Sequence, residues 1–322
     1  MLCEGLDVMD KKEPALKALV IGGGGFIGVH LVTRLVISGR QVTVLDRSAL
    51  LDRFLHEQIT YVVGDFSDKK IVDELVAEHD EVIHLAYATV PNTSFDDPLA
   101  DLVQNLRPAV QLFEIVAKHG ARLMLVSSGG TVYGEAQDDF ISEDHPTHPI
   151  SPYGVTKLTL EKYAYLYAVT RGLNVVCVRP ANPYGEGQRP FSGQGFIATA
   201  MAMALQHKAI SIFGSQGTVR DYIYIDDLIE GLLFVLNGGE CSTVYNIGSS
   251  IGRSNLDVIQ AMRPLLADIG IDVQVNIAPA RSFDVQRNVL DCTRLRQLGW
   301  SPRTAFDDGL QRTLTWLQEY LR

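Results

Sequence analysis

The chain has few cysteines, and the four that it has are scattered along 322 residues. They form neither a CxxC pair nor the regular spacing of a disulfide framework, which argues against a disulfide-stapled secreted scaffold and a structural zinc site. We therefore expect free thiols in a reducing compartment, a cytoplasmic protein and no bound metal. The cysteines are Cys3, Cys177, Cys241 and Cys292.

Positive charge and long apolar runs are also lacking. Lys and Arg total 28 against 38 Asp and Glu, giving a formal net charge of −10, the wrong sign for binding nucleic acid or an anionic membrane. No apolar run approaches the roughly 18 residues needed to cross a bilayer, and residues 1–14 are acidic and polar. We expect neither nucleic acid nor membrane as a partner, and an anionic ligand would need local arginines.

What is present is a composition typical of a well-packed globular protein. Hydrophobic residues make up 46% of the chain and charged residues only 20%, which argues against an intrinsically disordered chain. The length suffices for about two domains of roughly 100 to 200 residues each.

Short apolar runs alternate with helix-patterned stretches through the first half of the chain. Continuous apolar strands separated by helices indicate a parallel sheet covered on both faces, which is the doubly wound α/β plan. The predicted strands are residues 18–21, 41–45, 59–63, 81–85, 122–126 and 174–178.

After Arg179 the composition changes to that of loops rich in Gly, Pro and Asn, and we expect a second, smaller unit to begin there. It contains the apolar stretch 196–205 and a strand-like segment that ends at Phe213. Residues 244–248 look like a buried strand that returns to the first sheet. The spacing of the leucines in 306–321 predicts a packed terminal helix.

A glycine-rich turn follows the first predicted strand directly and opens a helix. Its sequence is Gly22-Gly23-Gly24-Gly25-Phe26-Ile27-Gly28. Glycines at such a turn let the backbone approach a pyrophosphate, whose charge the helix N-terminus then holds. A plain glycine turn is the alternative, but the second strand ends at Asp46, where an acid accepts ribose hydroxyls. We therefore predict dinucleotide binding.

Asp46 also bears on which dinucleotide is bound. Its carboxylate would repel the 2′-phosphate of NADP while accepting both adenosine ribose hydroxyls of NAD. Arg47 is the opposing signal, since a guanidinium can pair with a 2′-phosphate. On balance the pair favours NAD.

Tyr153 and Lys157 stand four residues apart and therefore share one face of a helix. A phenol with its ordinary pKa of about 10 is a poor base, and an adjacent cation together with a bound dinucleotide would favour the phenolate. Lys157 could also hold the nicotinamide ribose. Mere packing is the alternative for aromatic residues on this helix, but the glycine turn upstream favours catalysis.

These two motifs, in this order and separation, resemble those of the extended short-chain dehydrogenase/reductase superfamily, and other segments resemble its NAD-dependent nucleotide-sugar epimerases, such as UDP-glucose and UDP-N-acetylglucosamine 4-epimerases. The resemblance runs from Lys17 to the C-terminus. Its further segments are Gly64-Asp65, His84-Leu85-Ala86, Asn105, Ser127-Ser128, Val132-Tyr133-Gly134, Arg179-Pro180, Asn182-Pro183-Tyr184-Gly185, the run from Arg220 to Asp227, Asn246-Ile247-Gly248 and the run from Leu298 to Pro302.

The resemblance implies a Rossmann-type NAD-binding domain and a smaller C-terminal α/β domain for the nucleotide sugar. The first would be residues 1–178, with 221–248 returning to it, and the second residues 179–220 and 249–322. The implied cofactor-binding residues are Gly22, Gly25, Phe26, Ile27, Gly28, Asp46, Arg47, Asp65, Phe66, Leu85, Ala86, Tyr87, Asn105, Ser127, Tyr153, Lys157 and Pro180.

The resemblance also assigns Asn182, Arg220 and Arg281 to the substrate diphosphate, in line with the need of a net-negative protein for charge-assisted donors. Surface ion pairs are the alternative: Arg220 with Asp221 or Asp226, and Arg281 with Asp284. A homodimer is implied through the helix with Tyr153 and the helix near residues 102–117, although the apolar residues there could equally be ordinary core.

One departure from the family pattern concerns the catalytic Ser or Thr, which usually stands four residues before the tyrosine of the Val-Tyr-Gly motif. That position is Gly129 here, which has no hydroxyl. Hydroxyl side chains flank the glycine pair, so we hypothesise that Thr131, with Ser128 as second choice, supplies the missing contact to the reacting sugar.

The same loop bears on the reaction. Related 4,6-dehydratases carry an Asp-Glu pair directly after their catalytic threonine, and these positions are Gly130 and Thr131 here. We therefore favour epimerisation at C4 of a UDP-sugar through a transient 4-keto sugar. A dehydratase or reductase, and a non-catalytic dinucleotide sensor, stay open.

Asn288 lies seven residues after Arg281, where the resemblance places the residue that bounds the sugar's C2 substituent. Epimerases restricted to plain hexoses typically carry a bulky tyrosine there. The smaller Asn288 predicts acceptance of N-acetylated UDP-hexosamines.

Overall fold

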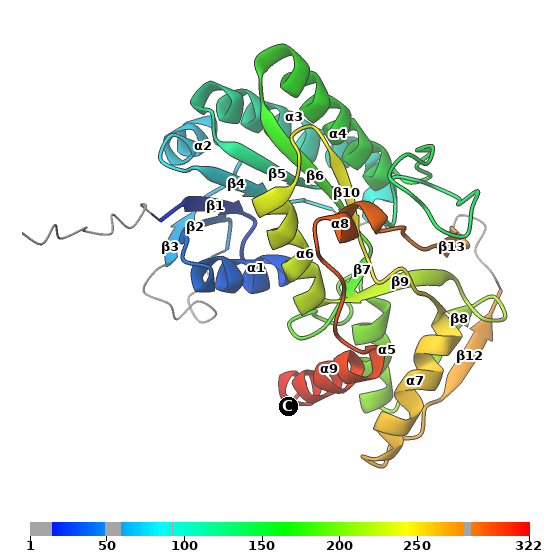
Figure 1. Cartoon of the computed structure of the whole chain (residues 1–322). Helices are drawn as coiled ribbons and strands as arrows, with labels where there is room; N and C mark the ends of the chain where they lie inside the picture. Colours follow the sequence, from blue (N-terminus) through cyan, green and yellow to red (C-terminus); the bar gives the residue numbers. More distant parts are fainter. Residues whose placement is uncertain (1–14, 49–58, 90, 92, 280–284) are drawn as a thin grey trace, which may run out of the picture.

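The computed structural model describes residues 15–48, 59–89, 91, 93–279 and 285–322. A seven-stranded sheet with the order β10-β6-β5-β4-β1-β2-β3 lies at its centre (Figure 1). Its strands are β1 (Lys17–Ile21), β2 (Gln41–Asp46), β3 (Ile59–Val63), β4 (Glu81–His84), β5 (Arg122–Val126), β6 (Asn174–Pro180) and β10 (Val244–Ile247). The predicted doubly wound α/β class is confirmed.

All neighbouring strands of this sheet run parallel. Alternate side chains of one strand enter different cores: Ile83 packs on the side of α1 (Phe26–Ile37) and α6 (Ile225–Gly238), and Val82 on the other side. That other side is covered by α2 (Lys69–Val76), α3 (Pro98–His119) and α4 (Pro152–Arg171). Burial on both faces explains why the strands are continuous apolar runs.

The strand order reverses between β1 and β4, because β2 lies on one side of β1 and β4 on the other. Ligands of open α/β sheets bind outside the carboxyl ends of the strands at such a point. The glycine turn after β1 and the segment after β4 both start at this edge.

The smaller unit lies below the large sheet in Figure 1. Strand β9 pairs with β7, β11 and β13, and β8 pairs with β12. Its strands are β7 (Asn182–Tyr184), β8 (Ile210–Phe213), β9 (Val219–Tyr224), β11 (Gly252–Ser254), β12 (Val275–Ala278) and β13 (Arg287–Asn288). The remaining helices are η1 (Thr93–Phe95), α5 (Phe196–Leu205), α7 (Asn255–Ala267), α8 (Thr293–Gln297) and α9 (Phe306–Tyr320).

Two links join the units in a way that shapes the site. Strand β10 returns from the smaller unit to pair with β6 of the large sheet. Ile141, in the loop after β5, forms a bridge with Leu290 just beyond β13. The C-terminal segment is thereby held against the loop that carries Gly129 and Thr131. The domain boundaries drawn from the sequence stay a prediction.

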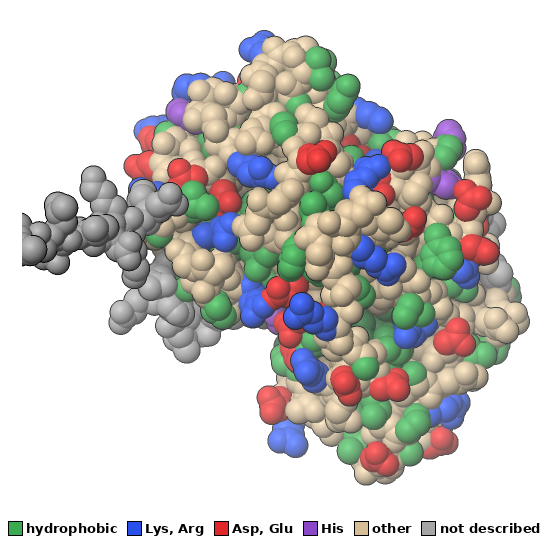
Figure 2. All heavy atoms as spheres, in the orientation of Figure 1, with side chains coloured by type: hydrophobic (Ala, Val, Ile, Leu, Met, Phe, Trp, Pro, Cys, Tyr) green, Lys and Arg blue, Asp and Glu red, His purple; other side chains and the backbone are tan. Residues whose placement is uncertain are grey.

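Acidic and basic side chains intermix on the face drawn in Figure 2, where the described residues form no extended basic area. Among the helices of the described ranges, none combines the length and apolar character needed to cross a bilayer.

Candidate active site

The turn after β1 is too tight for side chains and presents backbone N–H groups at the start of α1. Gly22 has a φ of +85°, a conformation that glycine adopts without strain. A Cβ there would lie 2.6 Å from the backbone nitrogen of Ala86. Helix α1 begins at Phe26, and its first turn has no side-chain cap. This geometry fits the pyrophosphate of a dinucleotide.

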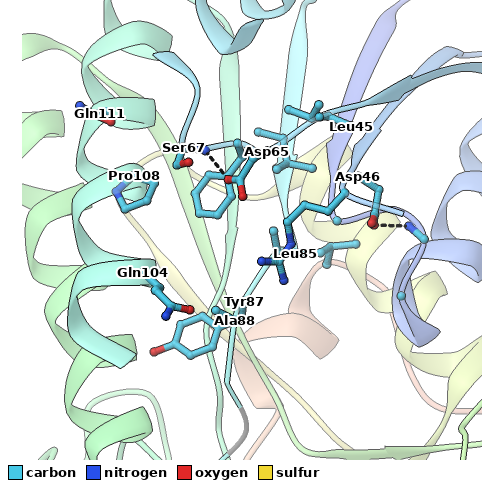
Figure 3. A pocket seen from close by; sticks show the side chains of 18 of the residues that line it. Leu45, Asp46, Asp65, Ser67, Leu85, Tyr87, Ala88, Gln104, Pro108 and Gln111 are labelled. Atoms are coloured by element: carbon cyan, nitrogen blue, oxygen red, sulfur yellow. Dashed lines mark hydrogen bonds between the residues drawn. The ribbon is translucent and has the colours of Figure 1, made fainter. Parts of the chain in front are cut away.

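A first cavity of about 820 Å³ opens at the carboxyl ends of β1 to β4 (Figure 3). Asp46 Oδ2 accepts a hydrogen bond from the Gly24 backbone at 3.0 Å, which ties the carboxylate to the glycine turn. Asp65 accepts one from the Ser67 backbone at 2.8 Å, and this bond holds the pKa of Asp65 below its usual value. Nine of the residues predicted to bind the cofactor line this cavity: Gly22, Gly25, Asp46, Arg47, Asp65, Phe66, Leu85, Ala86 and Tyr87.

Helix α3 supplies one wall of this cavity, which the sequence interpretation missed. Gln104, Arg107, Pro108 and Gln111 line it, and Figure 3 shows three of them in a row along the helix. Their spacing of three and four residues places them on one helix face. The polar side chains on this face, next to the predicted Asn105, were the feature of the sequence that could have indicated a cavity wall.

A second cavity, of about 530 Å³, adjoins the first, and Gly22, Gly25, Leu85 and Tyr87 line both. Most of the predicted catalytic and substrate-binding residues meet here. They are Ser128, Thr131, Tyr153, Lys157, Asn182 and Arg220, joined by the cofactor residues Phe26, Ile27, Gly28, Ser127 and Pro180. Sequence reasoning missed others, among them Thr89 and Gln188, which lie in no motif, and Tyr222, which lies in the run from Arg220 to Asp227 but was given no role.

The start of α4 fixes the tyrosine and the lysine. Ser151 caps the helix by accepting a hydrogen bond from the Gly154 backbone at 3.1 Å, so Tyr153 lies in the first turn. The Tyr153 backbone N–H donates to Ser94 Oγ at 3.2 Å. Lys157 Nζ donates to the carbonyl of Val126, at the end of β5, at 2.9 Å. These contacts hold the backbone at Tyr153 and the ammonium of Lys157, and both residues line the second cavity.

Burial sets the protonation of this pair. It lowers the pKa of Lys157 to about 8, and it raises the pKa of Tyr153, with a smaller contribution from the carboxylate of Asp101. The expectation that this cation, together with a bound dinucleotide, favours the phenolate stays a prediction. Lys157 Nζ lies 5.7 Å from the centre of the Tyr153 ring and only 4.2 Å from that of Tyr87.

Gly129 faces away from the cavity. Its N–H donates to the carbonyl of Pro180 at 2.8 Å, and a Cβ on it would lie 2.5 Å from Leu290 Cδ1 and 2.9 Å from the carbonyl of Arg179. A Cβ on Gly130 would instead lie 3.3 Å from Asn182 Oδ1, a residue that lines the second cavity. Position 129 therefore has no room for the serine or threonine of the family pattern.

Thr131 and Ser128 both line the second cavity. The Thr131 hydroxyl is buried and has no hydrogen-bond partner among the residues that the structure describes. A buried, unpaired hydroxyl is costly unless a ligand satisfies it. Thr131 thus has the geometry expected of the group that replaces the missing hydroxyl.

Asn288 supports the glycine pair and does not line the cavity. Its side chain is 1% exposed, and Nδ2 donates to the carbonyl of Gly129 at 3.0 Å. It is absent from the residues that surround the second cavity. The direct boundary with a sugar substituent that we expected of Asn288 is therefore not seen.

Asn182 on β7 and Arg220 on β9 approach the second cavity from the smaller unit. The acidic residues considered as alternative partners of Arg220 have other contacts. Asp221 is fully buried and accepts hydrogen bonds from Ser249 and Leu290, and Asp226 lies 3.8 Å from Arg312. Arg281 lies outside the described residues, as does Asp284.

Asn105 is buried behind the cavities. Its Oδ1 accepts from the Ala88 backbone at 2.8 Å, and its Nδ2 donates to the carbonyl of Asp101 at 2.7 Å. It holds the segment after β4 against α3 and lines neither cavity. Its expected contact with the nicotinamide stays a prediction.

A glycine turn at the reversal of a parallel sheet, with a Tyr-Lys pair in the adjoining cavity, defines a Rossmann-type enzyme that uses a dinucleotide. Residues 18–248 match the model of the NAD dependent epimerase/dehydratase family. The chain belongs to this family, and the predicted cofactor NAD is confirmed.

Curated relatives come from both branches of the family. The UDP-glucose 4-epimerase of Mycolicibacterium smegmatis is 33% identical over 310 residues, covering 93% of this chain and 97% of that protein. The dTDP-glucose 4,6-dehydratase of an Actinoplanes species is 30% identical over 318 residues, covering 94% and 97%. The crystal structure of the Thermotoga maritima UDP-glucose 4-epimerase with UDP-glucose is 30% identical, covers 95% of this chain and all of that one, and has a TM-score of 0.88.

Proposed function

We propose that the protein epimerises a UDP-hexose or UDP-N-acetylhexosamine at C4 through a transient 4-keto sugar. The observation that carries this proposal is the lining of the second cavity. It combines Tyr153, Lys157, Thr131 and Arg220, and none of its described residues is an Asp or Glu. Elimination of water needs a general acid beside the leaving hydroxyl, and the related 4,6-dehydratases carry an Asp-Glu pair next to their catalytic threonine. This lining therefore favours epimerisation over dehydration.

Tyr153 is the proposed base that accepts the proton of the C4 hydroxyl. Lys157, at the next helical turn, supplies positive charge that favours the phenolate when it forms. Thr131, or else Ser128, donates a hydrogen bond to the same sugar oxygen. A bound NAD would supply the hydride acceptor and donor for C4, so no external oxidant or reductant would be consumed.

Arg220 and Asn182 are the proposed anchors for the substrate diphosphate, together with Arg281. Arginine suits this role because its planar guanidinium pairs with phosphate oxygens in a fixed geometry. Tight binding of the nucleotide lets a loosely held keto sugar turn and present its other face. The Thermotoga relative with UDP-glucose supports a UDP-sugar as the ligand.

The proposed substrate range includes N-acetylated sugars. Gly130 leaves the wall beside Asn182 without a side chain. Asn288 has a structural part in this proposal, since its amide holds the carbonyl of Gly129. This substrate range is tested by comparing the turnover rates of plain and N-acetylated UDP-sugars.

The test is proton NMR of the purified protein with UDP-glucose, UDP-galactose and their two N-acetylated counterparts, without added cofactor. We expect the C4 epimer to form, and turnover under these conditions requires NAD retained from expression. A stable keto product or a change in NADH absorbance would support a dehydratase or reductase. Binding of NAD without turnover of any of the four, also with NAD supplied, would support a sensor.

A homodimer is the proposed assembly, formed through α3 and α4. These two packed helices expose large apolar side chains to solvent, up to 71% at Leu99 and 67% at Val169. The others are Leu102, Val103, Val155, Tyr163, Tyr165 and Leu166. Exposed apolar area of this kind marks contact surfaces. Sedimentation should give twice the chain mass, and Leu166→Arg should reduce it to one chain.

A further inference from the structure

Asp101 on α3 is a carboxylate buried behind the Tyr-Lys pair, and it has no place in the mechanism above. Its exposed fraction is 0%. A buried carboxylate is costly unless hydrogen bonds and opposite charge compensate it. Both are present around Asp101, so the surroundings are built to hold a charge at this point.

Hydrogen-bond donors from three parts of the chain converge on the carboxylate. The Thr156 hydroxyl on α4 donates to Oδ2 at 2.6 Å. The Thr89 hydroxyl, after β4, donates to Oδ1, and Asn105 Nδ2 lies 3.4 Å from Oδ1. Thr156 immediately precedes Lys157 in the sequence, and Thr89 lines the second cavity.

Tyr87 connects this cluster to the catalytic pair. The edge of its ring packs against Tyr153 with the ring centres 4.7 Å apart, and Lys157 Nζ lies over its face at 4.2 Å. Its buried hydroxyl is close enough to Asp101 for the carboxylate to raise its pKa, after the larger effect of burial. The ring that orients Lys157 is therefore itself under the influence of Asp101.

We propose that Asp101 is a positioning residue of the active site, which fixes the start of α4 through Thr156 and the segment after β4 through Thr89, and whose negative charge acts on Lys157. This role of Asp101 rests on the proposed function, because it concerns the arrangement of Tyr153, the proposed base, and of Lys157. Nothing in the reaction requires Asp101 to touch the substrate.

The electrostatic effect of Asp101 has a definite sign. Burial lowers the pKa of Lys157 to about 8, and Cys177, Glu161 and Asp101, in decreasing order of effect, act in the opposite direction. The negative charge of Asp101 therefore favours the ammonium form of Lys157. Removing the charge should lower the pKa of Lys157 further. The other titratable groups around the pair are Tyr87, Tyr153, His84 on β4, Cys177 on β6, and Glu161 on α4, which is paired with Arg179.

The experiment measures the titration of Lys157 itself. Holoenzyme labelled with ¹³C at lysine Cε is titrated by NMR, and the Lys157 signal is assigned by its loss in Lys157→Met. We expect Asp101→Asn to lower the midpoint below that of wild type, because the variant lacks the negative charge that favours the ammonium form. The alkaline limb of kcat should move in the same direction. Asp97→Asn is the control, because Asp97 is an exposed carboxylate four residues earlier on the same helix, whose capping role asparagine can keep.

The outcomes separate this proposal from the proposed function. An equal midpoint in Asp101→Asn and wild type, in an enzyme that forms the epimer, overturns the role of Asp101. A lowered midpoint in a protein that turns over no sugar retains the electrostatic role and rejects the epimerase.

A second pair of variants tests the positioning and decides the matter if Asp101→Asn does not fold. Thr156→Val removes one donor to the carboxylate at constant shape, and Thr156→Ser keeps it. We expect kcat to fall about tenfold in the valine variant, the effect of losing one hydrogen bond to a charged group, with KM unchanged. Serine should restore most of the rate. Equal rates in the two variants would contradict positioning through this hydroxyl.

Discussion

Adding a methyl group at Gly129 should destabilise the protein rather than improve its catalysis. The Cβ of Gly129→Ala would lie 2.5 Å from Leu290 Cδ1, 2.9 Å from the Arg179 carbonyl and 3.1 Å from the Pro180 carbonyl. Carbon atoms prefer separations of about 3.5 to 4.0 Å. Leu290 is fully buried, and both carbonyls belong to β6 of the large sheet, so neither neighbour moves away easily.

Two effects of opposite sign determine how much the free energy of unfolding changes in Gly129→Ala. Overpacking of this kind costs about 1 to 3 kcal/mol, whereas replacing glycine restricts the unfolded chain and contributes about 0.4 to 1 kcal/mol of stability. The clash prevails, so the free energy of unfolding should fall by about 1 to 2 kcal/mol. For a chain of this length that corresponds to a decrease in Tm of about 2 to 3 °C.

Chemical denaturation of Gly129→Ala against wild type measures this, with Gly130→Ala as the matched control. A Cβ at Gly130 meets only Asn182 Oδ1, at 3.3 Å, and Ser128 Oγ, at 3.9 Å, so this variant should keep its stability and raise the KM for the sugar. Gly129→Ser, which restores the hydroxyl of the family pattern, should lose stability without gaining rate. An increase in kcat in Gly129→Ser would refute the assignment of the catalytic hydroxyl to Thr131 or Ser128.

Three further outcomes follow from the site. Activity should decline as pH rises through about 8, where Lys157 loses its proton. The free energy of unfolding should increase from there to pH 10.5, because the unfolded lysine still holds the proton that the folded one has released. Lys157→Met should remove the decline in activity and the increase in stability. Arg220→Met should raise the KM for the nucleotide sugar about 10- to 100-fold, the effect of one charged hydrogen bond, and an unchanged KM would exclude Arg220 from the diphosphate site. Asn288→Ala should lower the free energy of unfolding by about 1 to 2 kcal/mol and leave the ratio of N-acetylated to plain substrate rates unchanged. A changed ratio would indicate that Asn288 contacts the C2 substituent of the sugar.

The sheet and the first cavity were predictable because their signals are local in the sequence. A strand buried on both faces must be apolar along its whole length, and β3 and β5 have the predicted bounds. The glycine turn is equally local: Gly22 and Ala86 leave no room for a side chain between them. Carboxyl ends of parallel strands share one edge, which brings Asp46 and Asp65 into the same cavity.

The room available to a side chain in a loop is not a local property of the sequence. The spacing to Tyr133 aligns Gly129 with a catalytic hydroxyl, but the room for a Cβ at this position is limited by Leu290, 161 residues later in the chain. The bridge between Ile141 and Leu290 brings that leucine to the loop. The hydrogen bond from Asn288 to the carbonyl of Gly129 is likewise not visible in the sequence, because 159 residues separate the two.

Buried polar clusters share this difficulty, and Asp101 shows why they carry information on function. Its partner Thr156 is 55 residues away, and neither residue stands out in a helix pattern. Only the packing of α3 on α4 brings them together behind Lys157. Sequence motifs identify residues that contact a ligand. The contacts that hold such residues in place, made here by Asp101, Asn105 and Asn288, are visible only in the structure. Both epimerases and dehydratases are similar to this chain, and differences between such enzymes are therefore to be sought in these supporting contacts as well as in the motifs.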